Sequence, residues 1–271
     1  MPGPNCYDLF EAATRRLLGV DRIDGPLEHS LNEAYKYLCS AFHKSEPVSY
    51  GNELVRAAYM LTFAPRYAIY WQCFYRLNEF LWGFARLRTP ASGVLKFNCI
   101  GLGPGSEVVG IATSGIPGLT RIDLNVIDCE PEWLEALESC LVALEAEAGI
   151  TAPNLFHYPS LANAERGWPV IGSFVLSDIA RQGSLEAFMA ELANRTKGQP
   201  AAFMDTYAYL DADRGEQLIE HNLGLKPWTV NLHSECGLQL ALNEQFSSSR
   251  RLSFQKPQAD PKVAVFKVRF R

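Results

Sequence analysis

Three glycines at alternate positions are the residues of this 271-residue chain that most clearly indicate chemistry. Gly101, Gly103 and Gly105 lie in the segment FNCIGLGPGSE, where an apolar run ends and a helical pattern begins. Glycine lets the backbone turn tightly and lets a ligand approach the main chain, because no Cβ stands in the way. The segment therefore predicts a cofactor-binding loop; the alternative is a structural turn without a ligand.

The spacing of these glycines indicates which cofactor the loop would take. Dinucleotide-binding loops favour GxGxxG, which places the pyrophosphate at the N-terminus of the following helix. Here the pattern is GxGxG, and Ser106 stands where a dinucleotide loop has its third glycine. S-adenosylmethionine carries no phosphate, so it needs the close approach of the backbone but less of an anion site. The loop favours S-adenosylmethionine over a nicotinamide or flavin cofactor.

A carboxylate follows the next apolar run of the chain. Asp128 ends the segment LNVID and lies about twenty residues beyond the glycine loop, the separation of one βαβ unit. A carboxylate at this place can accept two hydrogen bonds from a ribose diol. The alternative is that Asp128 only caps the following helix. Cys129, directly after it, is assigned to the same cofactor site.

The elements that must position these residues divide the chain into two parts. Helical periodicity fills the first part and predicts helices at 7–18, 27–42, 52–63 and 66–87. After the Thr-Pro-Ala-Ser-Gly punctuation, strands are expected at 94–102, 122–127, 154–158, 173–176 and 201–204, and helices at 106–113, 132–147, 185–195 and 214–222. Strands at 228–233 and 263–270 close the chain with no helix expected between them, which predicts an antiparallel edge hairpin.

Alternation of strands and helices predicts an α/β fold with a Rossmann-like parallel sheet. We expect residues 93–271 to form this cofactor-binding domain and residues 1–92 to form an all-helical cap on the substrate side.

The segments GLGPG at 101–105 and VIDCEPEWL at 126–134 together resemble the class I S-adenosylmethionine-dependent methyltransferases. The resemblance covers roughly the last two-thirds of the chain. It implies that the three glycines line the methionine and ribose of the cofactor and that Asp128 holds the ribose hydroxyls. It also implies a sheet of seven strands with the last one antiparallel.

The chain departs from that family's pattern at two positions. The acidic residue common two positions before the first glycine is replaced by Cys99, so Glu107 becomes a candidate partner for the ammonium group of the cofactor. The acidic residue expected after the third strand is also absent, because the chain reads HYPS at 157–160. Recognition of the adenine would then come from backbone groups or ring stacking.

Candidate catalytic residues follow from the place where ligands bind in such sheets. Methyl transfer mainly requires that acceptor and methyl group are held in near-attack geometry, and a base is needed only when the acceptor loses a proton. Ligands lie outside the carboxyl ends of parallel strands, which points to Asp178 after the fourth strand and Tyr207 after the fifth. Asp178 would orient or deprotonate the acceptor; alternatively it contacts the cofactor or caps a helix.

An aromatic run with mostly helical spacing lies before the glycine loop. It consists of Tyr59, Phe63, Tyr67, Tyr70, Trp71, Phe74 and Tyr75. Either it packs the helices onto the sheet, or it covers the cofactor and forms a wall of the acceptor pocket. Arg56, Arg66 and Arg76 would meet an anionic acceptor or form a solvated face. The segment 57–68 is similar to a methyltransferase-like family linked to the mitochondrial small ribosomal subunit, which implies an RNA-associated role instead.

Composition bears on the class of partner. The net charge of −5 and the pI near 5.6 disfavour binding to nucleic acid by phosphate neutralisation alone, and binding to anionic membranes. The seven cysteines are scattered and form no CxxC pair, so no metal site is expected, and Cys99 and Cys129 should be buried small hydrophobes in a cytoplasmic protein. We expect a methyltransferase whose acceptor is a small molecule under the helical cap. The alternatives are an RNA- or ribosome-associated methyltransferase and a non-catalytic cofactor-binding assembly protein.

Overall fold

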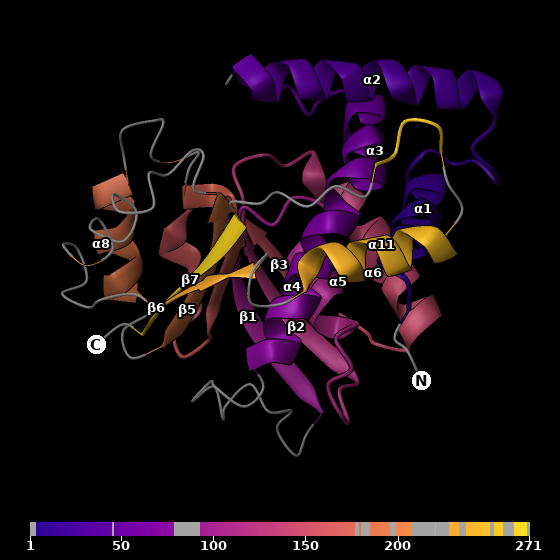
Figure 1. The fold of residues 1–271 in the computed structure, drawn as a ribbon. Coiled ribbons are helices and arrows are strands. Elements are labelled where there is room, and N and C mark those ends of the chain that lie inside the picture. The colour runs from indigo at the N-terminus through magenta and orange to yellow at the C-terminus, as the bar shows by residue number, and fades with distance from the viewer. Residues whose placement is uncertain are drawn as a thin grey trace.

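The computed structural model forms a central sheet with helices on both faces (Figure 1). It describes residues 4–44, 46–78, 93–176, 179, 185–195, 199–206, 220, 228–232, 237–249, 252–256 and 263–269. The prediction of an α/β fold with a parallel sheet is confirmed.

Four helices precede the sheet: α1 (Cys6–Leu17), α2 (Gly25–Lys44), α3 (Glu53–Thr62) and α4 (Ala64–Asn78). Two of them begin at asparagine caps, because the Asn5 side chain accepts from the N–H of Tyr7 and the Asn52 side chain accepts from the N–H of Leu54. The four helices match the predicted ones closely. The part of the predicted helix 66–87 beyond Asn78 lies outside the described residues.

The sheet has the strand order β3-β2-β1-β4-β5-β7-β6. Its strands are β1 (Val94–Ile100), β2 (Arg121–Ile127), β3 (Leu155–Tyr158), β4 (Val170–Ser173), β5 (Pro200–Thr206), β6 (Trp228–Asn231) and β7 (Val263–Arg269). Strands β1 to β5 are paired in parallel, and β7 lies antiparallel between β5 and β6. The helices of this part are α5 (Ser106–Ala112), α6 (Trp133–Ala148), the short 3-10 helix η1 (Leu161–Asn163), α8 (Leu185–Arg195) and α11 (Leu238–Ser248).

Two predictions for the second half of the chain were wrong in part. The fourth strand ends at Ser173 and does not span 173–176, because Phe174 takes a left-handed backbone conformation with φ 59°. The apolar residues that follow are buried without being part of the strand: Leu176 packs in the core under α8.

At the end of the chain, the predicted antiparallel pairing of the two closing strands at the edge of the sheet is confirmed, but their direct connection was wrong, since helix α11 lies between β6 and β7. Leu238, Leu242 and Phe246 form the buried face of this helix at a spacing of four. The exposed apolar residue Leu240 and the neighbouring Ala241 lie between these positions, so the apolar period is not distinct in the sequence. The predicted helix 214–222 lies outside the described residues, apart from residue 220.

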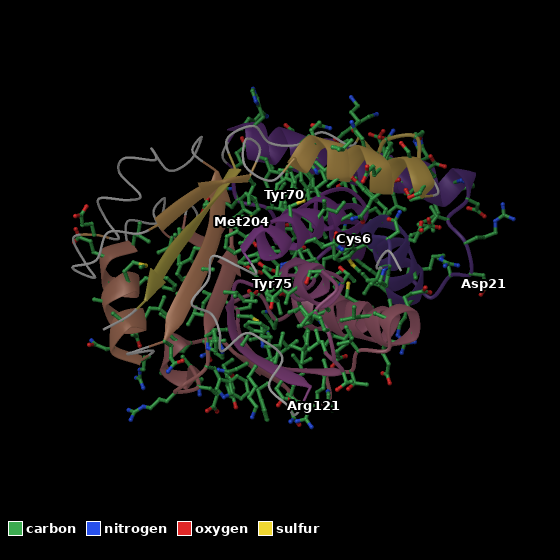
Figure 2. The ribbon with its side chains drawn as sticks, turned by 60° about the horizontal axis from the view of Figure 1, so that its bottom comes forward. Cys6, Asp21, Tyr70, Tyr75, Arg121 and Met204 are labelled. Carbon is green, nitrogen blue, oxygen red and sulfur yellow. The ribbon has the colours of Figure 1, made fainter. Side chains whose placement is uncertain are left out.

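Apolar side chains form separate clusters on the two faces of the sheet. Helices α1, α4, α5, α6 and α11 share one cluster with one face, and α8 packs against the other face (Figure 1). Cys6 of α1 and Tyr70 of α4 are buried inside the molecule, whereas Asp21 lies at its periphery (Figure 2). A third cluster joins α2 and α3 to residues 252 and 254. Helices α1 and α4 are thus packed on the same face of the sheet that carries α5.

Two buried amides anchor the loop between β3 and β4. Asn98 Nδ2 donates to the carbonyls of Glu165 and Trp168 at 2.9 and 3.2 Å, and its Oδ1 accepts from the N–H of Glu165 at 2.7 Å. Asn125 Nδ2 donates to Asn98 Oδ1 at 2.8 Å and to the carbonyl of Asn163 at 2.9 Å. These bonds fix the chain leading into β4.

In the part of the chain that the structure describes, no helix is long and apolar enough to cross a bilayer.

Candidate functional site

The site lies where the order of the strands reverses. From β1 the chain continues outward to β2 and β3 on one side, and β4 and β5 lie on the other side. Ligands of open α/β sheets bind outside the carboxyl ends of the strands at such a switch point. The glycine loop directly follows β1, at that edge.

Glycine is required at the three positions of the loop for different structural reasons. All are left-handed, with φ of 59° at Gly101, 52° at Gly103 and 92° at Gly105. A Cβ on Gly105 would lie 2.8 Å from Leu137 Cδ1, whereas a Cβ on Gly103 would meet nothing nearer than 3.9 Å, from Trp133. Gly105 is therefore required by packing against α6 as well as by its backbone, while the face of Gly103 stays open for a ligand.

Asp128 is brought to the glycine loop by the pairing of β1 with β2. Its Oδ2 accepts from the N–H of Gly103 at 3.2 Å and its Oδ1 accepts from the N–H of Glu130 at 3.0 Å. Burial raises the pKa of Asp128, and the two N–H donors and His157 lower it. Helix α6 has Glu132 as its N-cap residue, so Asp128 does not cap that helix. Each carboxylate oxygen keeps a further lone pair for a donor.

Glu107 is a buried carboxyl immediately below the loop. Glu107 is only 1% exposed. Its carboxylate accepts hydrogen bonds from the backbone N–H of Glu107 and from both the hydroxyl and the N–H of Ser173. Oε2 has no hydrogen-bond partner among the described residues. The pKa of Glu107 is raised to about 8, mainly by burial and in part by the nearby Asp128, while the hydrogen-bond donors lower it.

Position 99 lies beside the same carboxyl. Burial raises the pKa of the Cys99 thiol, and the charge of Glu107 adds to this effect. The carboxyl of Glu107 therefore faces the position at which the resembled family has its acidic residue. Cys99 is buried as expected, but Cys129 is exposed, so the expectation of a buried thiol there was wrong.

Rings from several elements form a continuous series from the glycine loop to the end of β4. Trp133, which lies below Gly103, has its ring centroid 5.3 Å from that of Tyr59. The centroids of Tyr59 and Tyr67 are 6.3 Å apart, and those of Tyr67 and Phe174 are 4.2 Å apart. Tyr59 and Tyr67 are only partly buried.

The aromatic run thus divides between the two roles expected for it. Tyr70, Trp71 and Phe74 lie on the face of α4 that is buried in the core, as expected for a packing face. Tyr59 and Tyr67 keep exposed surface close to the loop.

The nearby arginines are bound to protein groups. Arg56 is buried, and it donates to the carbonyl of Tyr50 at 2.7 Å and lies 3.5 Å from the carboxylate of Glu135. The expectation of a solvated face was therefore wrong for Arg56. Arg66 donates to the carbonyl of Thr62, and its guanidinium lies 4.7 Å from the ring centroid of Phe63. The side chain at position 76 lies outside the described residues.

Two predicted catalytic residues, Asp178 and Tyr207, lie outside the described residues. Two residues that no motif singled out, Trp71 and Ser173, are found at the site: Trp71 Nε1 donates to Ser173 Oγ at 2.7 Å. The sequence pattern indicates only a strand at Ser173 and one ring of an aromatic run at Trp71, so only the fold brings them together. Among the residues with described positions, no cluster of three or more His, Cys, Asp or Glu side chains is arranged to hold a metal.

Neither a family model nor a curated protein matches the chain. Similar solved structures include an arsenic(III) S-adenosylmethionine methyltransferase from Chlamydomonas reinhardtii, with 15% identity, 75% of this chain and 73% of that chain covered, and a TM-score of 0.40. Another is the mitomycin 7-O-methyltransferase MmcR, at 15% identity, 88% and 67% coverage and a TM-score of 0.43. A third is the plantazolicin methyltransferase BamL in complex with triazolic desmethylPZN analog and SAH, at 10% identity, 96% and 95% coverage and a TM-score of 0.43. At these TM-scores, none of them identifies a site residue or an acceptor for this chain.

Proposed function

We propose that the chain is a methyltransferase that binds S-adenosylmethionine at the edge of β1, β2 and β4. The observation that carries the proposal is the arrangement of two carboxylates around one left-handed glycine loop. Asp128 is bonded to the N–H of Gly103, and Glu107 keeps one buried oxygen without a partner among the described residues.

Glu107 fits the cationic end of this cofactor. A buried carboxylate oxygen without a donor is unfavourable unless a ligand supplies one, and a hydrogen bond from an ammonium group is of the strong, charge-assisted kind. The pyrophosphate of a dinucleotide would instead place negative charge beside Asp128 and would supply no cation to Glu107. This repulsion supports S-adenosylmethionine over a dinucleotide, in agreement with Ser106 at the third glycine position.

Asp128 fits the ribose of the same cofactor. Its two oxygens are held in place by backbone N–H groups, which leaves one lone pair on each for the two hydroxyls of a diol. Cys129, exposed beside it, would lie at the rim of the same site. Gly101, Gly103 and Gly105 would form the backbone surface on which the cofactor lies.

When bound, the cofactor supplies a methyl group on a positively charged sulfur. The residues of the chain need to hold the acceptor in line with that methyl group and keep water away. Tyr59, Tyr67 and Phe174 are positioned for an acceptor wall, since their rings extend from the loop to the end of β4. Asp178 and Tyr207 remain the proposed groups for orienting or deprotonating the acceptor.

We propose a small molecule as the acceptor, bound between the helical cap of residues 1–92 and the domain of residues 93–271. The net charge of −5 supports this over RNA. A basic patch would be needed for the RNA-associated alternative, and Arg56 is already engaged by Tyr50 and Glu135.

The test is turnover. Purified protein is incubated with S-adenosylmethionine and pools of small nucleophilic acceptors or with RNA, and S-adenosylhomocysteine is measured by mass spectrometry, with Asp128→Ala as the control. We expect product with one small-molecule pool and none with the variant. Product with RNA alone would overturn the small-molecule acceptor. Cofactor binding without product from any pool would favour a non-catalytic assembly protein.

A further inference from the structure

Trp71 and Ser173 connect the helical part of the chain to the buried carboxyl of Glu107. Trp71 lies on α4, Ser173 is the last residue of β4, and Glu107 is on α5. Trp71 Nε1 donates to Ser173 Oγ at 2.7 Å, and Ser173 in turn donates from its hydroxyl and its N–H to the Glu107 carboxylate. The three side chains form one hydrogen-bonded series.

The donors and acceptors in this series have a fixed direction. An indole N–H can only donate, so the hydroxyl oxygen of Ser173 must accept from Trp71. The single hydrogen of that hydroxyl is then available for Glu107. The other oxygen of Glu107, Oε2, has no partner among the described residues. Once the carboxyl is ionised, it therefore presents one free acceptor in a defined position.

Both donor residues are themselves held in place by packing. Trp71 is 2% exposed, and its Cβ lies 2.7 Å from where a Cβ on Gly110 of α5 would be, so α4 and α5 touch closely at this point. Phe74 packs edge-on against the Trp71 ring at 5.6 Å. A bulkier residue than glycine at 110 would push Trp71 away from Ser173.

The backbone after Ser173 is fixed as well. Phe174 is the one residue other than glycine with positive φ among the described residues, and its N–H donates to the carbonyl of Met204 at 2.7 Å. Its ring packs on Tyr67. Unfavourable backbone conformations of this kind persist where the surroundings enforce them, often at functional sites.

We propose that Trp71 and Ser173 are positioning residues that hold the Glu107 carboxylate for the cationic amino group of the cofactor. The inference rests on the proposed function. The helical part would thereby contribute to cofactor affinity without touching the cofactor.

A change in these donors should alter the titration of Glu107. Among the described residues, the titratable groups that interact with it are Asp128, directly after β2, and Cys99 of β1, while Ser173 of β4 and Trp71 of α4 are neutral donors. The bonds from Ser173 favour the ionised carboxylate and so oppose the effect of burial on its pKa. Without the hydroxyl, ionisation and cation binding would require a higher pH.

The test follows the carboxyl carbon of Glu107 by NMR titration in the ligand-free protein, with Glu107→Gln to assign the signal. We expect Ser173→Ala to raise the midpoint by roughly one pH unit, equivalent to about tenfold weaker binding of S-adenosylmethionine near neutral pH. Trp71→Phe should raise it by less, because the hydroxyl stays but loses its orienting donor. Ser173→Thr, which keeps the hydroxyl, should restore the native midpoint.

Phe74→Leu is the matched control, since it removes one edge contact with the Trp71 ring, while the close contact of Trp71 with α5 at Gly110 and its hydrogen bond to Ser173 remain. It should leave the midpoint unchanged. Unchanged midpoints in Ser173→Ala and Trp71→Phe, or an equal shift in Phe74→Leu, would overturn the positioning role. Failure of the native protein to bind S-adenosylmethionine at any pH would overturn the proposed function, and with it the relevance of these residues to the cofactor. Native binding with unshifted variants would overturn the inference alone.

Discussion

At the scale of single residues, the environment of Glu107 is poorly suited to a charged side chain. Burial raises its pKa to about 8, so without a ligand the carboxyl is largely protonated at neutral pH. A cation can pair with it only after the proton leaves. Binding of S-adenosylmethionine should therefore release a proton below about pH 8, and the affinity should rise with pH up to that point.

This linkage is measurable by calorimetry in buffers of different ionisation enthalpy. We expect native affinity to increase by about tenfold per pH unit from about pH 6 to 7 and to level off above pH 8. Glu107→Gln should bind at least tenfold more weakly at about pH 8 and lose the pH dependence. A native affinity independent of pH would show that Glu107 does not pair with the cofactor.

The raised pKa of Glu107 has the opposite consequence for stability: affinity for the cofactor should rise with pH, whereas the stability of the ligand-free protein should fall. Its pKa in the folded protein, about 8, lies above the ordinary value of 4.5. The contribution of this group to stability is therefore complete below about pH 4.5 and is lost as the pH rises through about 8. Ligand-free Glu107→Gln should melt several degrees higher than the native protein at about pH 9. Near pH 4.5 the two should be similar; equal melting temperatures at both pH values would contradict the burial of a charged Glu107.

The sequence was enough to identify the site residues whose separation along the chain indicates their position in the fold. The GxGxG loop and Asp128 lie about one βαβ unit apart, and that separation places them at the same edge of a parallel sheet. Glu107 was a candidate because Cys99 replaced an expected acid. Trp71 and Ser173 are about a hundred residues apart, and only the pairing of β1 with β4 and the docking of α4 on α5 bring them together.

At the scale of elements, the contact of α4 with α5 depends on one glycine. Replacing a glycine inside a helix by alanine normally stabilises the protein by about 0.5–1 kcal/mol. At Gly110 the added methyl would clash with the Ala68 carbonyl and the Trp71 Cβ, so the sign should reverse. We expect Gly110→Ala to lower the free energy of unfolding by roughly 1–3 kcal/mol, measured by urea denaturation. A gain in stability would contradict this close packing.

The loop between β3 and β4 depends on the amide of Asn98. Asn98→Ala would leave the N–H of Glu165 and the carbonyls of Glu165 and Trp168 without that partner. We expect a loss of about 2–4 kcal/mol in urea denaturation. Asn243→Ala, at an exposed position of α11, is the matched control and should change stability by less than about 0.5 kcal/mol. Similar losses in both variants would contradict the anchoring role.

Elements with a clear period could be predicted, and those with mixed patterns could not. Helices α1 to α4 and α6 follow from repeated apolar positions. The fourth strand was displaced because the buried residues Val170 and Ile171 were not distinguishable from the equally apolar 174–176. The left-handed turn at Phe174 that separates them depends on its contacts in the fold.

At the scale of the whole molecule, the helical part and the sheet share one apolar cluster. Cys6, Phe10 and Trp71 from α1 and α4 pack in the same cluster as Phe97 of β1. This supports a site in which the proposed cap of residues 1–92 and the sheet act together. Alternating strands and helices were enough to predict the fold class. The position of β7 between β5 and β6 could not be predicted in this way, because strand order is decided by crossovers that leave no local pattern.

The most direct test of the central claim is calorimetric titration of the purified protein with S-adenosylmethionine and S-adenosylhomocysteine, with Asp128→Ala measured alongside. Asp128 accepts from Gly103 and Glu130 and would hold the ribose, so its loss should remove both the diol contact and the support of the loop. We predict micromolar binding of both ligands by the native chain, weakened at least about tenfold in the variant. Absence of binding of either ligand to native protein that circular dichroism shows to be folded would contradict the account.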